Sequence, residues 1–470
     1  MSCISSLRSS GVSVTIYLSG MISWLKTARL LLAYLSNSVW SSTSFALVIT
    51  PHCRATARAI AEEEITLCVG DTSFLDYGGI KKKRQGYGPQ GNGGNGLLLH
   101  SALAVDPAQG QPLGLLWQKV WNRQHRPQPP KKETPRQKKK RQAKARKASR
   151  NRPFEQKESY RWVEAMQAVE KIVSPSTRTI HVFDREGDIA EVFEQLNHLR
   201  NTGVVVRASH NRRLEQDPNR LWEKLEAQRV QLEYEIDLPK TKDRSAHTAK
   251  LVVRCCLVQL QRPTRLADSH PLQVYAVYAT EVDPPEDEDP VSWMLLTSEA
   301  VTTVEMAQTI LRWYTYRWRV EEYHKILKSG TQAERYRLAA EGMKTLLGFL
   351  CVTAVELLRL TYLERTSPQR PAQDVVTPLQ LKVLISKTPK VPKPLTVSWA
   401  VKAVARLGGY LEHRRNTPIG IQVLWKGWAK LNLLMEGWQL ATQETYREKS
   451  DSLITELMLV SFLITSWLQG

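Results

Sequence analysis

Two short apolar runs, each followed at once by an aspartate, place the strongest constraint on how this chain folds. The first run, ITLCVG at residues 65–70, leads to Asp71, and the second, TIHVF at residues 179–183, leads to Asp184. Short runs rich in β-branched and apolar residues are typical of strands buried inside a sheet. A carboxylate at the C-terminal end of such a strand lies at the sheet rim, where α/β proteins hold their sites. We therefore expect an α/β fold with both aspartates at a sheet rim.

A third polar group falls on a helical pattern, YTYRWRVEEYHKILKSG at residues 314–330. At about 100° of rotation per residue, four of its polar side chains share one stripe about 60° wide. They are Tyr314, Arg317, Glu321 and Lys328. One carboxylate, two cations and a phenol on one face suit a surface that holds a metal ion together with a phosphate. The alternative is a surface helix with ordinary salt bridges, and each aspartate taken alone can be a turn or cap residue.

Together, Asp71, Asp184 and Glu321 make a candidate site of three carboxylates. Such a site can hold two divalent metal ions roughly 3.5–4 Å apart and promote in-line attack on a phosphodiester. Glu322 competes with Glu321, but its projected direction, about 80°, faces away from the stripe. His324 projects at about 280°, off the stripe and without a partner, and is not predicted as a metal ligand.

The three blocks resemble those of the DDE transposases of bacterial insertion sequences, in the insertion-sequence-four family that includes the transposon-five transposase. They stand here as GDTSFLDY, HVFDREGDI and the Tyr-Arg-Glu-Lys pattern, at residues 70–77, 181–189 and 314–330. Further stretches fit, among them KESYRW and VVVRASHNRR, and the resemblance runs from about Val48 to about Leu440. It implies an RNase H-like catalytic core in which Asp71, Asp184 and Glu321 bind Mg²⁺, with Mn²⁺ able to substitute.

The resemblance also implies roles for cations and aromatic residues around the carboxylates. Tyr314, Arg317 and Lys328 would bind the phosphate that flanks the cut. Arg207, in VVVRASH, would contact the end of the DNA element. Trp293 would stack on a flipped base while a DNA hairpin forms at that end. A lone tryptophan in this position is alternatively a core residue.

The charge of the chain favours a polyanionic partner. Its 66 Lys and Arg against 46 Asp and Glu give a net charge of +20, which favours nucleic acid first and an acidic membrane second. Residues 119–152 alone contain fifteen Lys or Arg and one acid, Glu133. We expect a flexible, solvated insertion that contacts DNA phosphates without sequence preference. The six cysteines show no zinc spacing, which indicates reduced thiols in a cytoplasmic protein.

The expected organisation places an RNase H-like core around a β-rich insertion, followed by a helical C-terminal region. The segments are an unassigned N-terminus (1–46), the first part of the core (47–203, with the basic insertion 119–152), a β-rich insertion (204–298), the second part of the core with the signature helix (299–375), a helical dimerisation region (376–440) and a tail (441–470). The family's N-terminal domain, which reads the transposon end, is not recognisable in residues 1–46. Apolar residues recur at helical steps in the C-terminal region and predict either subunit pairing or core packing. They are Trp425, Trp428, Leu431, Leu434 and Trp438.

The function implied by the resemblance is cut-and-paste transposition. A homodimer would hold double-stranded transposon ends and target DNA in a synaptic complex in the bacterial cytoplasm, associated with the nucleoid and without membrane contact. Mg²⁺-dependent phosphodiester hydrolysis and strand transfer would proceed through a hairpin end. One alternative is a truncated, inactive relative that binds DNA, dimerises and inhibits the full-length enzyme. The other is a metal nuclease that does not transpose, which would need neither the Tyr-Arg-Glu-Lys pattern nor Trp293.

Overall fold

Two compact units make up the part of the chain that can be described. The computed structural model describes residues 44–78, 86–90, 94–124, 132–238, 245–266, 272–411 and 419–442. Trp40–Leu358 form one unit, and the described residues from Arg359 onward belong to the second. The predictions for residues 1–43 and 443–470 therefore lie outside the described residues.

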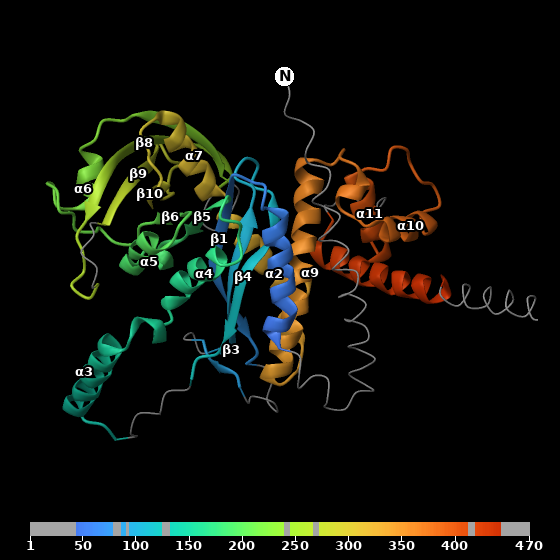
Figure 1. Cartoon of the computed structure of the whole chain (residues 1–470), viewed down its shortest axis with the longest axis horizontal. Coiled ribbons are helices and arrows are strands. Elements are labelled where there is room, and N and C mark those ends of the chain that lie inside the picture. Colours follow the sequence, from blue (N-terminus) through green and yellow to red (C-terminus); the bar gives the residue numbers. More distant parts are fainter. Residues whose placement is uncertain are drawn as a thin grey trace, which may run out of the picture. The chain divides into compact units, whose positions relative to one another are not determined.

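A ten-stranded mixed sheet is the framework of the larger unit (Figure 1). Its strands are β1 (Ile65–Asp76), β2 (Gly88–Pro89), β3 (Asn95–Val105), β4 (Pro112–Trp121), β5 (Arg178–Phe183), β6 (Thr202–Arg207), β7 (Leu232–Leu238), β8 (His247–Leu260), β9 (Leu272–Val282) and β10 (Ser292–Thr297). They follow the order β2-β3-β1-β5-β6-β10-β9-β8-β7. Strand β4 lies off this path and also pairs with β3. Strands β1, β5 and β6 are mutually parallel, and the remaining neighbours are antiparallel. The predicted α/β class and both buried strands are confirmed.

The β-rich segment continues this sheet. The β-rich insertion expected at residues 204–298 contains the strands β7 to β10. Strand β10 pairs with β6, so that Leu296 lies opposite Val206. The inserted strands thus cover an edge of the parallel strands that would otherwise expose unpaired backbone groups. A short helix, α6 (Leu221–Glu226), interrupts the otherwise β-rich sequence.

Helices α2 (Phe45–Ala59) and α4 (Tyr160–Glu170) pack on the sheet near β4. The expected helical spacing in α4 is confirmed, because Trp162 and Met166 are both fully buried. Trp162 packs against Phe183 at the end of β5, with ring centroids 4.7 Å apart. Burial of these rings fixes α4 beside the strand ends that carry the candidate site.

The basic insertion differs from the expectation of a segment without its own structure. Pro135–Asn151 form a helix, α3, with no buried residue, and this helix extends away from the sheet in Figure 1. A capping box between Thr134 and Gln137 begins it, and Pro135 occupies its first turn. Ala, Lys, Arg and Gln dominate its sequence, and these residues favour helix strongly enough to offset the repulsion between exposed charges. Residues 125–131 of the insertion are not described.

The signature segment is not the single helix that its sequence predicts. Helix α7 (Val304–Thr315) ends before α8 (Trp318–Lys325), and Ile326–Gly330 form a π-helical turn, η4. A projection at 100° per residue therefore holds only inside each piece. Tyr314 belongs to α7, Glu321 to α8 and Lys328 to η4.

The second unit is helical, as expected. Helices α10 (Pro378–Ser386) and α11 (Val397–Leu407) precede a long helix at residues 421–442. In that long helix Trp428 and Leu431 are buried, whereas Trp438 is exposed. The predicted apolar stripe is thus partly core and partly surface, and subunit pairing stays a prediction.

One helix, α9 (Ala340–Thr366), is long and apolar enough to cross a membrane. Within its most apolar 18-residue window, 83% is buried inside the protein. Core helices of water-soluble proteins meet the same criteria of length and composition, so this helix supplies no argument for a membrane.

Candidate active site

The two predicted aspartates lie at the same edge of the parallel strands. Strands β1 and β5 remain in register up to the pair Val69 and Val182. Asp71 and Asp184 each follow two residues later. The prediction that β1 ends at Asp71 is wrong, because this strand continues to Asp76 and places Asp71 opposite Ser101 of β3. What ends before Asp71 is the pairing with β5, and this opens the edge on which the carboxylates meet.

Gly70 allows this close packing. A Cβ atom at Gly70 would lie 2.8 Å from the Phe183 ring and 3.3 Å from Trp162. Real Cβ atoms essentially never approach a ring carbon so closely, so any side chain here would push β1 away from α4 and β5. The glycine before Asp71 thus fixes the distance between the two strand ends.

Asp184 has the capping role considered for it, and its role at a metal site stays a prediction. Its side chain caps a short 3-10 helix, η2 (Arg185–Gly187), by accepting a hydrogen bond of 2.9 Å from the Glu186 backbone N–H. Burial raises the pKa of Asp184, and the like charge of Asp71 raises it further, while Arg317 and Arg161 oppose the shift. Because the charge of Asp71 raises the pKa of Asp184, the two carboxylates lie near each other.

Arg317 connects Glu321 to the aspartates. Its guanidinium Nη2 is 2.6 Å from Glu321 Oε1, and the arginine side chain is 8% exposed against 40% for the glutamate. Burial acts to lower the pKa of Arg317, but Tyr314 and the carboxylates of Glu321 and Asp71 outweigh it, and the pKa is raised. The buried Nε of Arg317 has no hydrogen-bond partner among the described residues. This arginine therefore neutralises the carboxylates and keeps one donor unused.

The carboxylates only partly assemble the predicted metal site. No three His, Cys, Asp or Glu side chains in the described part of the chain approach closely enough to hold a metal ion. Asp71 and Asp184 fit a divalent ion, because carboxylate oxygens are the ligands that Mg²⁺ prefers. Glu321 is bound to Arg317 instead.

His324 has partners that the sequence did not reveal. Its Nδ1 lies 3.4 Å from Asp71 Oδ2, and its Nε2 lies 3.1 Å from the Ser101 hydroxyl. Gln118 Nε2 extends this buried network by donating to Ser101 and to Tyr323. A projection along α8 could not show these contacts, because the partners come from β1, β3 and β4. Through His324, the network contacts Asp71 and restrains its carboxylate.

The aromatic residues predicted to contact DNA are packed together. Tyr314 and Trp293 are 3% and 8% exposed, and their rings meet edge to face with centroids 5.3 Å apart. Arg207 donates a hydrogen bond of 2.8 Å to the Ser292 carbonyl and another to Tyr314. Base stacking by Trp293 stays a prediction, and it requires the ring to leave this buried position.

Lys328 lies in η4 and is half-buried. It forms no ion pair with any residue that the structure describes. A lysine without a counter-charge is available to an anion, so its predicted contact with phosphate stays a prediction.

Arg161 of α4 is a second cation at the site that sequence reasoning missed. Its Nε donates a hydrogen bond of 2.8 Å to Thr72 Oγ1, and its Nη2 pairs with Glu186. Burial lowers the pKa of Arg161, and the charges of Glu186, Glu158, Asp184 and Asp71 oppose the shift. The only sequence signal was the KESYRW stretch, which implies a match to the family but no role for the arginine.

The site thus has two aspartates at one sheet edge, a glutamate paired with the buried Arg317, and the partly buried Arg161 of α4. The chain matches no model of a known protein family. Assignment to a family therefore depends on the quoted motifs and on the chemistry of this site.

Proposed function

We propose that the chain is a DDE-type transposase, which cleaves and joins DNA at Asp71, Asp184 and Glu321 with Mg²⁺. The observation that carries the proposal is the position of Arg317, which pairs with Glu321 of α8 and lies near Asp71, on the strand parallel to the one that precedes Asp184. The strand order β4-β3-β1-β5-β6, with helices packed on it, supports an RNase H-like core. Among the reactions that such a core can catalyse, the motifs quoted above favour transposition.

Arg317 has two competing partners in this proposal. Its guanidinium binds Glu321 while no DNA is present, and its unused Nε is directed into a buried environment. A DNA phosphate is a strong bidentate partner for arginine and satisfies such a donor. Phosphate binding would therefore draw Arg317 away from Glu321 and free this carboxylate to join Asp71 and Asp184. Substrate binding and completion of the ligand set become a single event.

The remaining residues bind and orient the substrate. His324 holds the Asp71 carboxylate, so that its second oxygen keeps a fixed direction. Exposed cations of α3 contact the DNA backbone outside the site. A divalent ion bound by the three carboxylates would activate water or a DNA 3′-hydroxyl and stabilise the leaving oxygen.

Neutral isosteres test the proposal. Asp71→Asn, Asp184→Asn and Glu321→Gln should each abolish Mg²⁺-dependent strand cleavage of a transposon-end duplex, while DNA affinity in EDTA stays within about twofold. Glu322→Gln is the matched control, because this neighbouring glutamate pairs with Arg319 at 2.8 Å rather than with Arg317. Full cleavage by any of the first three variants would remove that residue from the site.

A second candidate function is that of an inactive relative that binds DNA and inhibits an active transposase. The absence of a three-ligand group among the described residues favours it. Mn²⁺ titration with and without DNA separates the two. Under the leading proposal, a duplex raises the affinity for Mn²⁺ because it releases Glu321. Under the second, the affinity is weak in both cases and Glu321→Gln does not change it.

A further inference from the structure

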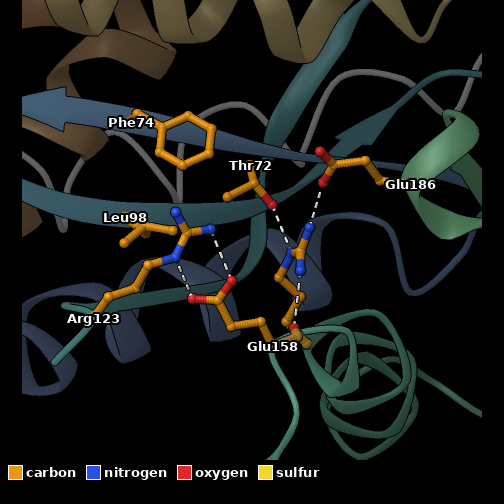
Figure 2. Close-up of a pocket in the computed structure, with 7 residues that line it drawn as sticks. Thr72, Phe74, Leu98, Arg123, Glu158 and Glu186 are labelled. Atoms are coloured by element: carbon orange, nitrogen blue, oxygen red, sulfur yellow. Dashed lines mark hydrogen bonds and ion pairs between the residues drawn. The ribbon is translucent and has the colours of Figure 1, made fainter. Parts of the chain in front are cut away.

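A cavity of about 290 Å³ opens beside the carboxylates, on the face of β1 that α4 covers (Figure 2). Successive residues of a strand point to opposite faces. Thus Asp71 faces α8, whereas Thr72 and Phe74 face α4 and line the cavity. Glu186 lines it as well, two residues after Asp184. The cavity therefore lies on the face of β1 opposite Asp71, near the edge where β5 no longer pairs with β1.

Arginines form much of its wall, but their donor edges are occupied. Arg123 makes a two-point ion pair with Glu158, at 2.6 and 2.8 Å, and donates to the Gln90 carbonyl. Arg161 donates to Thr72, Glu186 and the Glu158 carbonyl. An arginine binds phosphate through its N–H edge. Each guanidinium thus has three of its five N–H groups engaged, while its flat faces stay open to stacking.

The charge of the lining also disfavours an anion. Two guanidinium groups are balanced by the carboxylates of Glu158 and Glu186, as Figure 2 shows. Asp71 and Asp184 lie near Arg161 and add negative charge. A phosphate would have to displace a glutamate in a site that already holds an excess of carboxylates. A neutral ligand meets no such cost.

The apolar part of the lining is flat and open. Phe74 is 37% exposed, a high value for a phenylalanine, and lies opposite Leu98 on β3. The Arg123 guanidinium lies 5.5 Å from the Phe74 ring centroid. Aromatic rings and arginine planes are the surfaces on which single nucleobases stack. The cavity is large enough for one base, and its rim carries carboxylate oxygens as hydrogen-bond acceptors.

We propose that this cavity binds one unpaired nucleobase of the DNA strand whose phosphate lies at the carboxylates. The proposal rests on the DNA substrate proposed above. The base lies against Phe74 and the plane of Arg123. Its edge donates to Glu158 or Glu186, whose side chains are 41% and 58% exposed. Because these groups accept hydrogen bonds, bases with an exocyclic amino group (adenine, cytosine and guanine) bind better than thymine.

Fluorescence of an unpaired 2-aminopurine tests the pocket with the full-length chain in EDTA. The probe duplex carries this base beside a nick, and the reference duplex is identical but fully paired. Stacking in the pocket quenches the probe. Phe74→Ala should abolish the quenching and weaken binding of the probe duplex by roughly 5- to 150-fold, the range expected for one base–aromatic stack. Binding of the paired duplex should not change.

Two further variants guard against effects on folding. Phe74→Leu keeps the apolar volume but not the aromatic face, and should lose most of the quenching. Glu191→Gln breaks a two-point Arg–Glu pair outside the cavity, in which Arg265 donates to Glu191 at 2.8 and 3.0 Å. This variant should behave as wild type. Equal preference for the probe duplex in wild type and Phe74→Ala would overturn the proposal. So would thymine bound as well as the amino bases.

The sequence around the unpaired base assigns its source. A probe effect confined to transposon-end sequence places an end base in the pocket, and an equal effect with random sequence places any strand there, including target DNA. Cleavage is scored separately from binding. A Phe74-dependent probe effect without cleavage would leave the pocket intact and refute the transposase. Normal cleavage with no probe effect would support the transposase and refute the base-binding pocket.

Discussion

Two arginines on opposite faces of β1 neutralise carboxylates in different ways. On the α8 face, Arg317 binds Glu321 and leaves its buried Nε without a partner among the described residues. On the α4 face, Arg161 donates through all three of its nitrogens. An arginine with an unused buried donor gains from a new anion, whereas one whose donors are satisfied loses a bond for each bond that it makes. The first is suited to function, and the second to holding the site together.

The largest effect expected from this comparison is that of Arg317→Ala. Cleavage should fall by roughly 10²- to 10³-fold, as when one preorganised donor to a reacting oxygen is lost. Mn²⁺ affinity without DNA should rise, since Glu321 and the aspartates lose their internal counter-charge. The readouts are a cleavage gel and isothermal titration, with Arg319→Ala as the control. Loss of cleavage together with weaker metal binding would show that Arg317 merely supports the fold.

Helix α3 extends the comparison to a set of exposed cations whose nearby carboxylate is Glu133, paired with Arg141. Changing Lys138, Lys139 and Lys140 to Gln should lower the slope of log K against log salt by up to about 2.7, at roughly 0.9 per phosphate contact. Three exposed lysines of the second unit, Lys382, Lys387 and Lys390, serve as the control set. An unchanged slope would mean that α3 does not touch DNA.

Arg161→Met should act on stability more than on chemistry. It removes the side-chain hydrogen bond to Thr72 and the ion pair with Glu186, at a cost of about 1–3 kcal/mol in the free energy of unfolding. Arg265→Met removes an exposed pair with Glu191 and should cost no more than about 1 kcal/mol. Urea unfolding measures both. If Arg161→Met lowered the free energy of unfolding no more than Arg265→Met, the two faces of β1 would not differ as described.

The smallest expected effect concerns pH. Burial and the charge of Asp71 raise the pKa of Asp184 above its unfolded value. A raised pKa means that stability is full below the unfolded pKa and is lost as the pH rises through the folded pKa. Asp184→Asn removes this loss and still caps η2. It should therefore unfold at a higher temperature than wild type at pH 7, with the difference vanishing as the pH falls toward about 4. A constant difference would exclude the ionised carboxylate as its cause.

The sequence predicted those parts of the site that depend on local pattern. Apolar runs located β1 and β5, and therefore the edge shared by Asp71 and Asp184. A spacing of four residues placed Arg317 next to Glu321, since this interval survives the break before α8. Periodicity could not predict the break itself or the π-helical turn, because packing of α8 against β1 and β3 accompanies them.

The remaining parts depend on contacts between distant residues. His324 and Asp71 are brought together by the sheet and α8, and no pattern within either element encodes their contact. The Phe74 cavity needs five separate segments: β1, β3, the residues after β4, the start of α4 and the turn after β5. Arg161 lay in a quoted motif, but its role depends on which strand α4 covers. Such sites are set by tertiary packing, which composition and spacing do not report.

The π-helical turn at Ile326–Gly330 makes the length of this segment as important as its composition. A π turn accommodates one residue more than an α-helical turn of the same rise. Deleting a single residue before Lys328 would restore α-helical spacing and turn Lys328 by about 100° relative to Glu321. A substitution in this turn can be absorbed by one side chain, whereas a one-codon deletion would redirect Lys328. Among homologous genes, gaps should therefore be rarer here than in the adjoining loops.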